Sequence, residues 1–254
     1  MKSNNTWILL RGLAREKGHW GPFPEQLKEA FPGREVLCID LPGVGEFREL
    51  SSPTRMQEIF EFVRGQAVEK AKAQSSFTLL AISLGGMVAM EWMRQRPSDL
   101  SGCVMINTSV GPLSPIYRRL RWQVWGRFLR LVTMKSPRER ERAIIELLMN
   151  NEEVRAGALA LWSKLAMERP IRHRVVLHQL LAASRYEGLT EPTSVPVLLL
   201  SGLGDRLVDP SCSQDLQERW GWSLERHPWA GHDLPWDDPE WTLNKLRAWA
   251  GAKA

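Results

Sequence analysis

The sequence has few cysteines, and their number and spacing argue against a disulfide-bonded domain and against a zinc-binding one. Of its 254 residues only three are cysteine, at positions 38, 103 and 212. The number is odd and no pair has C-x-x-C spacing, which argues against a disulfide framework and against a zinc site. Cys38 and Cys103 stand in apolar, strand-like runs. We therefore expect buried, reduced thiols and no bound metal.

Long apolar runs are also absent. The opening stretch "MKSNNTWILLRG" has an apolar run too short for a signal-peptide core, and no segment reaches the length of a membrane span. Neither end carries a lipidation signal, and we find no internal repeat. These absences lead us to expect a cytoplasmic protein that does not insert into membranes. Because 43% of the residues are apolar, the chain can bury a sizeable core.

Short apolar runs alternate with helical segments along most of the chain. Strand-like runs lie at 6–12, 34–40, 76–83, 101–109, 194–202 and 222–228. Helical patterns lie at 19–31, 55–71, 84–97, 210–220 and 239–252. Continuous apolar runs suit strands buried on both faces. The alternation predicts an α/β fold with a doubly wound, mostly parallel sheet of about six strands.

One connection is too long for a simple crossover. About 85 residues, mostly of helical character, separate the fourth and fifth strand-like runs. We interpret residues 111–191 as a helical cap inserted into a core made of residues 1–110 and 192–254. Such a cap would cover the carboxyl edge of the sheet, where open α/β sheets bind ligands.

The stretch "AISLGG" at 81–86 puts a serine where a strand ends and a helix begins. A turn this sharp needs small residues two positions before and after the serine, and here they are Ala81 and Gly85. The usual pattern is G-x-S-x-G, the nucleophile elbow, which lifts the hydroxyl out of the sheet. The alternative is that Ser83 only caps the helix. We predict that Ser83 is a nucleophile.

A serine nucleophile needs a base and an acid that orients the base. After a nucleophile elbow, the acid comes first along the chain and the histidine base follows it. Asp205 comes one short turn after the fifth strand, and His232 stands in a loop before the last helix. Asp209 and His227 are the rival acid and base. Asp209 precedes a proline and a helix, which suits an N-cap, and His227 ends a strand. We predict Ser83, Asp205 and His232 as a catalytic triad.

Backbone N–H groups would complete the site by stabilising an oxyanion. One comes from Leu84, the residue after the nucleophile, and the other from Leu13, just after Gly12 in the loop that follows the first strand. Gly12 is also a predicted substrate-binding position. The predicted chemistry needs no metal and no cofactor.

Five stretches together resemble the α/β-hydrolase superfamily, in the serine esterase branch that includes pimeloyl-carrier-protein methyl ester esterases. They are "LLRGL", "DLPGVGEF", "AISLGG", "GLGDRLV" and "AGHDLPWDDP". Two positions depart from the pattern. Arg11 replaces a histidine before the glycine, and Glu46-Phe47 replaces an x-Ser ending. A hairpin common before the first strand is also missing, so we expect six parallel strands.

The predicted cap carries an excess of positive charge. Residues 112–176 hold 14 Lys and Arg against 6 Asp and Glu, while the whole chain has a net charge of +5. Trp122, Trp125 and Phe128 interleave with arginines, and we expect these aromatic residues to bind substrate as the lining of an acyl tunnel. Alternatively, this basic segment is only a solvated helix face. A nucleic-acid site or a membrane-binding surface is a less favoured interpretation.

The resemblance implies that a basic cap receives an acidic acyl carrier protein. Arg138 and Arg142, four positions apart on a helix, are the predicted contacts. The expected function is hydrolysis of a carboxylic ester or thioester through an acyl-enzyme, with a carrier-linked acyl methyl ester as one candidate substrate. A lyase or C–C hydrolase with the same triad, and a ligand-binding protein without catalysis, remain as alternatives. We expect no nucleic-acid partner.

Overall fold

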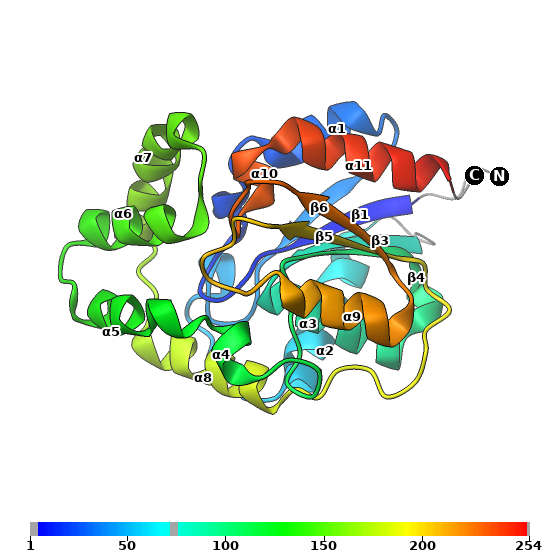
Figure 1. Ribbon diagram of the computed structural model, residues 1–254, viewed down its shortest axis with the longest axis horizontal. Helices are drawn as coiled ribbons and strands as arrows, with labels where there is room; N and C mark the ends of the chain where they lie inside the picture. Colours follow the sequence, from blue (N-terminus) through cyan, green and yellow to red (C-terminus); the bar gives the residue numbers. More distant parts are fainter. Residues whose placement is uncertain (1–4, 72–75, 253–254) are drawn as a thin grey trace.

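The computed structural model describes residues 5–71 and 76–252, which form one six-stranded sheet flanked by helices (Figure 1). Its strands are β1 (Asn5–Leu10), β2 (Val36–Ile39), β3 (Ser76–Ile82), β4 (Leu100–Ile106), β5 (Val197–Gly202) and β6 (Ser223–His227). The spatial order is β2-β1-β3-β4-β5-β6, and every neighbouring pair is parallel. The predicted α/β class with a six-stranded parallel sheet is confirmed.

Helices cover both faces of the sheet, as right-handed crossovers require. On one face lie α1 (Phe23–Ala30) and α11 (Pro239–Gly251), and on the other lie α2 (Met56–Lys70), α3 (Leu84–Gln95) and α9 (Ser211–Trp220) (Figure 1). Side chains alternate along β1: Trp7 and Leu9 join the core under α1 and α11, whereas Ile8 and Leu10 join the core under α2 and α3. This period of two explains why the strands are apolar throughout.

Short helical turns complete the core at the loops. They are η1 (Lys17–Trp20), η2 (Gly45–Phe47), η3 (Pro97–Asp99) and α10 (Leu234–Asp237). The sequence pattern at 19–31 predicted one helix, but the structure has η1 and α1 separated by Gly21 and Pro22. Gly21 has a positive φ of 57°, which helical backbone does not allow, so the helix has to restart after it.

The connection between β4 and β5 consists of helices that stand beyond the carboxyl ends of the strands (Figure 1). They are α4 (Ile116–Arg119), η4 (Trp122–Val124), α5 (Trp125–Thr133), α6 (Pro137–Leu148), α7 (Glu152–Glu168) and α8 (His173–Arg185). Val124, Ile145, Leu148 and Trp162 belong to a small hydrophobic cluster of their own. The domain boundaries at 111 and 191 stay a prediction.

The turn between α6 and α7 is tied to the core by a buried carboxylate. Asp237 accepts hydrogen bonds from the backbone N–H groups of Asn150 (2.8 Å) and Asn151 (2.9 Å), and from that of Gly231 at 2.5 Å. Asn151 also caps α7 through Glu153 N–H at 3.1 Å. One carboxylate thus fixes α6 and α7 relative to the loop that contains His232.

Within the described part of the chain, no helix has the length and apolar character to cross a bilayer. The three cysteines form no disulfide; Cys103 and Cys212 are buried, and Cys38 is half-buried. Burial raises the pKa of Cys38 to about 12 and that of Cys212 to about 11, so both thiols stay protonated at neutral pH.

Candidate active site

Ser83 occupies a strained turn between β3 and α3. Its φ of 54° and ψ of −115° lie outside the regions that non-glycine residues normally adopt. The turn brings the start of α3 against the end of β1: a Cβ at position 85 would lie 2.7 Å from the carbonyl oxygens of Leu10 and Arg11. Glycine at position 85 is therefore required by packing, and the turn leaves Ser83 partly exposed.

The loop after β1 runs directly past Ser83. A Cβ added to Gly12 would lie 3.2 Å from the Ser83 Cβ, a contact closer than most side chains make. Among the described residues, the backbone N–H groups of Leu13 and Leu84 have no hydrogen-bond partner. Leu84 is the first residue of α3, where the helix dipole adds positive potential. Both groups are free to donate to an oxygen bound near Ser83.

His232 and Asp205, the predicted base and acid, are in direct contact with each other. The His232 Nδ1 lies 2.6 Å from an oxygen of Asp205, and both residues are almost fully buried. The other Asp205 oxygen accepts hydrogen bonds from the N–H groups of Leu207 (2.7 Å) and Val208 (2.9 Å). These bonds hold the carboxylate in place and leave Nε2 as the free nitrogen of the ring. Ser83 and His232 both line the cavity described below.

The rival residues have other partners. Asp209 accepts a hydrogen bond from Ser211 N–H at 3.0 Å, at the start of α9. His227 accepts from Ala230 N–H at 2.9 Å, lies 3.1 Å from Asp238, and packs edge-on against Trp241. Both side chains stabilise local turns, and neither lines the cavity.

Asn107 ties together the loops that carry the acid and the base, a role that sequence reasoning missed. Its side-chain amide donates to the carbonyls of Gly231 (3.1 Å) and His232 (2.9 Å), and its oxygen accepts from Gly202 N–H at 2.9 Å. Asn107 follows β4 with a positive φ of 49°, which asparagine tolerates better than most residues. An asparagine directly after a buried strand was the available signal.

Arg11, the first departure from the family pattern, forms a buried ion pair with Asp233. Its two terminal nitrogens lie 3.2 and 2.5 Å from the two carboxylate oxygens, and the guanidinium stacks over Trp20 at 4.9 Å. Arg11 precedes Gly12, and Asp233 follows His232. The pair therefore connects the loop after β1 to the loop that carries the histidine. The sequence pointed to Arg11 but not to its partner.

The second departure, Glu46-Phe47, has a structural explanation. The Asp40 carboxylate accepts hydrogen bonds from the N–H groups of Lys17 (2.5 Å) and Glu46 (3.0 Å), which closes the loop after β2. Burial raises the pKa of Asp40 to about 6. The half-buried Phe47 ring packs edge-on against Phe62 at 4.8 Å and does not line the cavity.

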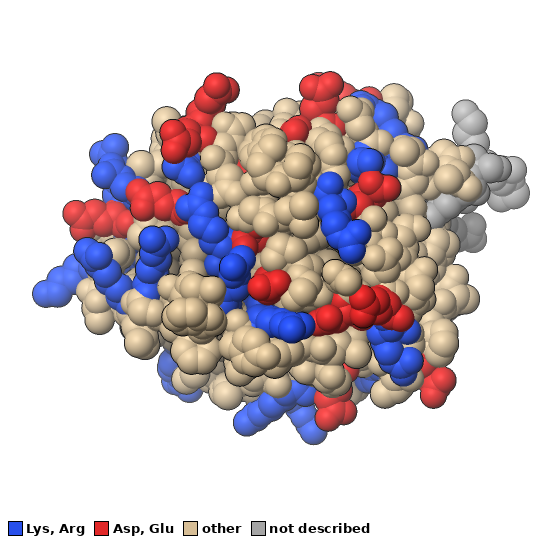
Figure 2. All heavy atoms as spheres, in the orientation of Figure 1, with Lys and Arg blue, Asp and Glu red and all other residues tan. Residues whose placement is uncertain are grey.

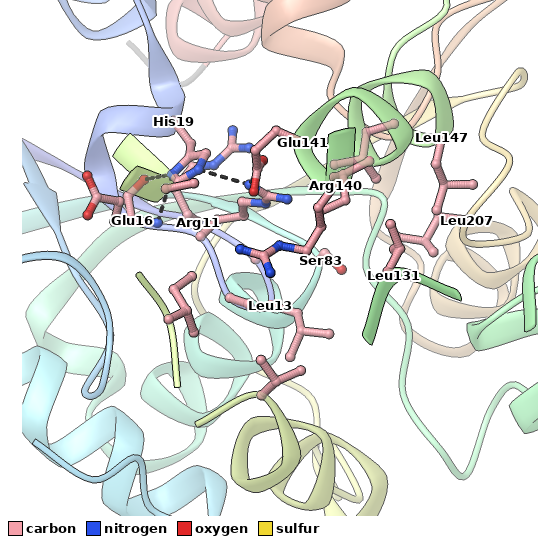
Figure 3. Close-up of a pocket in the computed structure, with 18 of the residues that line it drawn as sticks. Arg11, Leu13, Glu16, His19, Ser83, Leu131, Arg140, Glu141, Leu147 and Leu207 are labelled. Carbon is pink, nitrogen blue, oxygen red and sulfur yellow. Dashed lines mark hydrogen bonds and ion pairs between the residues drawn. The ribbon is translucent and has the colours of Figure 1, made fainter. Parts of the chain in front are cut away.

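The cavity has a volume of about 500 Å³ and lies between the sheet edge and the inserted helices. Most of its wall is aliphatic. Figure 3 shows Leu131, Leu147 and Leu207 on one side of Ser83 and Leu13 on the other. Gly12 also lines it.

One of the three aromatic residues predicted to bind substrate, Phe128, reaches the cavity wall, and the expectation for the other two needs correction. Trp122 and Trp125 are 64% and 44% exposed and lie outside the lining. Trp122 lies in η4 and Trp125 begins α5, and both side chains face outward.

A second set of buried charges forms the polar wall (Figure 3). Arg15 lies 2.6 Å from Glu141 of α6, and Glu16 forms a bidentate pair with Arg169 at 2.8 and 2.5 Å. Burial, and then the positive charge of Arg15, hold the pKa of His19 well below its ordinary value. The Nε2 of His19 lies 2.9 Å from Arg15, and its Nδ1 lies 3.1 Å from the backbone nitrogen and 3.2 Å from the carbonyl oxygen of Glu16.

Arg138 and Arg142 are exposed on α6, outside the cavity. Within the described chain no carboxylate pairs with either of them, or with Arg127 and Arg130 of α5. Figure 2 shows basic side chains gathered on the side of the molecule where α5 and α6 lie. Exposed Trp122, Trp125 and Leu129 lie on the same helical segment. We call these four arginines and three apolar residues the basic cap surface.

The parallel sheet, the strained serine turn and the inserted helices define the α/β-hydrolase fold. Solved structures with this fold superpose on nearly the whole chain. An esterase from Thermogutta terrifontis is 22% identical with a TM-score of 0.74, covering 98% of this chain and 90% of that one. An enol-lactonase from Burkholderia xenovorans is 16% identical with a TM-score of 0.77, covering 98% and 92%.

The chain belongs to the hydrolase family described as Serine aminopeptidase, S33, which matches residues 2–238. It is also similar to the pimeloyl-(acyl-carrier protein) methyl ester esterase of Pseudoalteromonas atlantica, 30% identical over 108 residues. That match covers 42% of this chain and 38% of the relative, so the chain matches less than two fifths of that protein. The superfamily expected from the sequence is confirmed.

We predict that breaking the Arg11–Asp233 pair destabilises the fold. Arg11→Gln or Asp233→Asn leaves a buried group without its partner, which costs about 3–5 kcal/mol of unfolding free energy. Lys28→Gln, which removes an exposed pair with Glu25, is the control and costs about 0–1 kcal/mol. Urea unfolding measures all three.

A double variant separates the pair from its surroundings. Arg11→Met with Asp233→Leu removes both charges, so its cost falls below the sum of the single substitutions. A cost below 1 kcal/mol for each single variant would mean that the two loops are held by something else.

Proposed function

We propose that this protein is a serine hydrolase that cleaves carboxylic esters with Ser83, His232 and Asp205 as its triad. One observation carries the proposal. Ser83 stands in a strained turn on the wall of the cavity that His232 also lines, and the His232 Nδ1 lies 2.6 Å from Asp205. A nucleophile, a base and an orienting acid in this order are what acyl transfer requires.

In the proposed reaction, Ser83 Oγ attacks the ester carbonyl while His232 Nε2 takes the hydroxyl proton. Asp205 keeps the Nδ1 proton in place and stabilises the imidazolium. The N–H groups of Leu13 and Leu84 hold the negative oxygen, each contributing about 3 kcal/mol to the transition state. The imidazolium then protonates the leaving alcohol. A water molecule, activated by His232, releases the acid and restores Ser83.

The family description raises aminopeptidase activity as a second candidate. A peptide amino terminus is a cation and needs a free carboxylate to bind it. The carboxylates on the cavity wall are Glu16, Glu141 and Asp233, and each is paired with an arginine. The aliphatic lining suits an acyl chain instead, and we therefore favour esters over peptides.

A carrier-linked ester is the finer form of the proposal. The relative in Pseudoalteromonas atlantica is named for a carrier-bound methyl ester, and the basic cap surface offers unpaired arginines beside exposed apolar side chains. An acyl carrier protein is acidic, so its surface complements this one. The acyl chain would enter the cavity beneath.

Ser83→Ala is expected to lower kcat on 4-nitrophenyl esters by about 10⁴–10⁶, because the attacking oxygen is gone. Its thermal unfolding stays close to that of the parent, since one partly exposed hydroxyl is lost. Ser184→Ala, at an exposed position of α8, serves as the control and keeps full activity. More than a tenth of the parent activity in Ser83→Ala would rule out the proposed nucleophile. Alanine 4-nitroanilide in the same assay tests the aminopeptidase candidate, which we expect to be slow.

Reversing Arg138 and Arg142 to Glu together is expected to raise KM for a carrier-linked methyl ester at least tenfold. Turnover of a small free ester stays the same, because the chemistry takes place beneath the cap. Added salt weakens only the carrier reaction, since exposed charges are screened beyond about 10 Å at 0.1 M.

The matched control reverses Arg96 and Arg247, two exposed arginines outside the inserted helices, with the same change in net charge. If both double variants raise KM alike, total charge rather than a docking surface is responsible. Equal loss on carrier-linked and free esters would assign Arg138 and Arg142 a structural role.

A further inference from the structure

Among the described residues, two arginines of the cavity wall, Arg140 and Arg174, have no counter-ion, and Arg140 is the less exposed of the two. Arg11, Arg15 and Arg169 are paired with Asp233, Glu141 and Glu16 respectively. Arg140 of α6 lines the same cavity and is half-buried, yet within the described parts of the chain no carboxylate pairs with it. Figure 3 shows its side chain extending from α6 into the cavity on the side of Ser83.

The neighbours of Arg140 cannot neutralise it. Glu141, the next residue, is 5% exposed and already lies 2.6 Å from Arg15. The remaining ionisable lining residues outside the pairs are His19, His173, Arg174 and His232, none of which carries negative charge. Around Arg140 the wall is aliphatic, with Ile144 and Leu147 one and two turns further along α6. Such surroundings screen the guanidinium weakly, so an anion that enters is bound more strongly than in water.

We propose that Arg140 is a specificity-determining residue that binds an oxyanion carried by the ester substrate at a distance from the reacting carbonyl. A guanidinium presents paired N–H donors that match a carboxylate or a phosphate. The inference rests on the proposed ester hydrolysis and deepens it: the substrate class is an ester with a negatively charged group on its acid or its alcohol part.

The alternative role for Arg140 is direct stabilisation of the oxygen at the reacting carbonyl. The two roles differ in what they predict. A residue that binds a remote anion affects KM for charged esters only, whereas a residue at the reacting carbonyl lowers kcat for every ester.

The test compares charged and neutral esters of matched length. On the acid side, 4-nitrophenyl hydrogen adipate is compared with 4-nitrophenyl hexanoate. On the alcohol side, the hexanoyl ester of 2-hydroxyethyl phosphate is compared with ethyl hexanoate. Arg140→Gln removes the positive charge, whereas Arg140→Lys keeps the charge but lacks the paired N–H donors of the guanidinium. Arg247→Gln on α11 is the control, because it removes one positive charge far from the cavity.

Arg140→Gln is expected to raise KM about 10- to 100-fold for at least one charged ester, the usual effect of losing a charged hydrogen bond. Both neutral esters stay within twofold, Arg140→Lys is intermediate, and Arg247→Gln resembles the parent. The charged ester whose KM rises shows whether the anionic group belongs to the acid part or to the alcohol part of the substrate. Unchanged KM for both charged esters, or equal losses on charged and neutral esters, would overturn the proposal.

Calorimetric titration with adipate and with hexyl phosphate makes the anion site testable without turnover. If the parent protein binds one of these anions and Arg140→Gln weakens that binding at least tenfold, the anion site is supported. This holds even if the parent protein hydrolyses no ester, in which case only the proposed reaction fails. Binding of neither anion by the parent would refute the site, whatever the turnover.

Discussion

Close packing of backbone around Ser83 is the constraint on which the rest of the structure depends. The ends of β1 and β3 approach so tightly that a Cβ at Gly12 or Gly85 would press on Ser83 or on the carbonyls of Leu10 and Arg11. A residue with φ of 54° persists only where its surroundings determine it fully. Packing of the sheet on both faces stabilises the strained turn. The turn places the Ser83 hydroxyl at a cavity, beside the N–H groups of Leu13 and Leu84, which have no partner among the described residues.

Buried ion pairs connect the loops around this turn. Arg11 joins the first loop to Asp233, and Arg15 joins it to Glu141 of the inserted helices. Buried pairs of this kind add modest net stability, but losing one partner is costly, so they favour a single arrangement of the loops. Because these carboxylates are used in pairs, none of the described lining carboxylates is left for the half-buried Arg140, which lies next to aliphatic walls.

Local patterns predicted much of the fold, because strand and helix periodicity and small residues at a sharp turn act over a few positions. The turn at Ser83 and the strand-end positions of Asp205 and His232 were accessible for that reason, and their catalytic roles remain proposals. The contact between Arg11 and Asp233 spans 222 positions and depends on side-chain direction, which no local pattern contains. Likewise, the pattern over residues 117–131 could not say which side chains meet the cavity. Trp122 and Trp125 were therefore misplaced, and Arg140, one turn into α6, went unnoticed.

The most direct test of the central claim is covalent labelling by a fluorophosphonate probe, followed by mass spectrometry of the modified peptide. We expect a single adduct on Ser83, formed much more slowly in Asp205→Asn because His232 loses its orienting partner at 2.6 Å. Asp209→Asn, whose carboxylate only caps a turn, should label at the parent rate. No adduct on Ser83 in the folded parent protein, or equal slowing by both substitutions, would contradict the account.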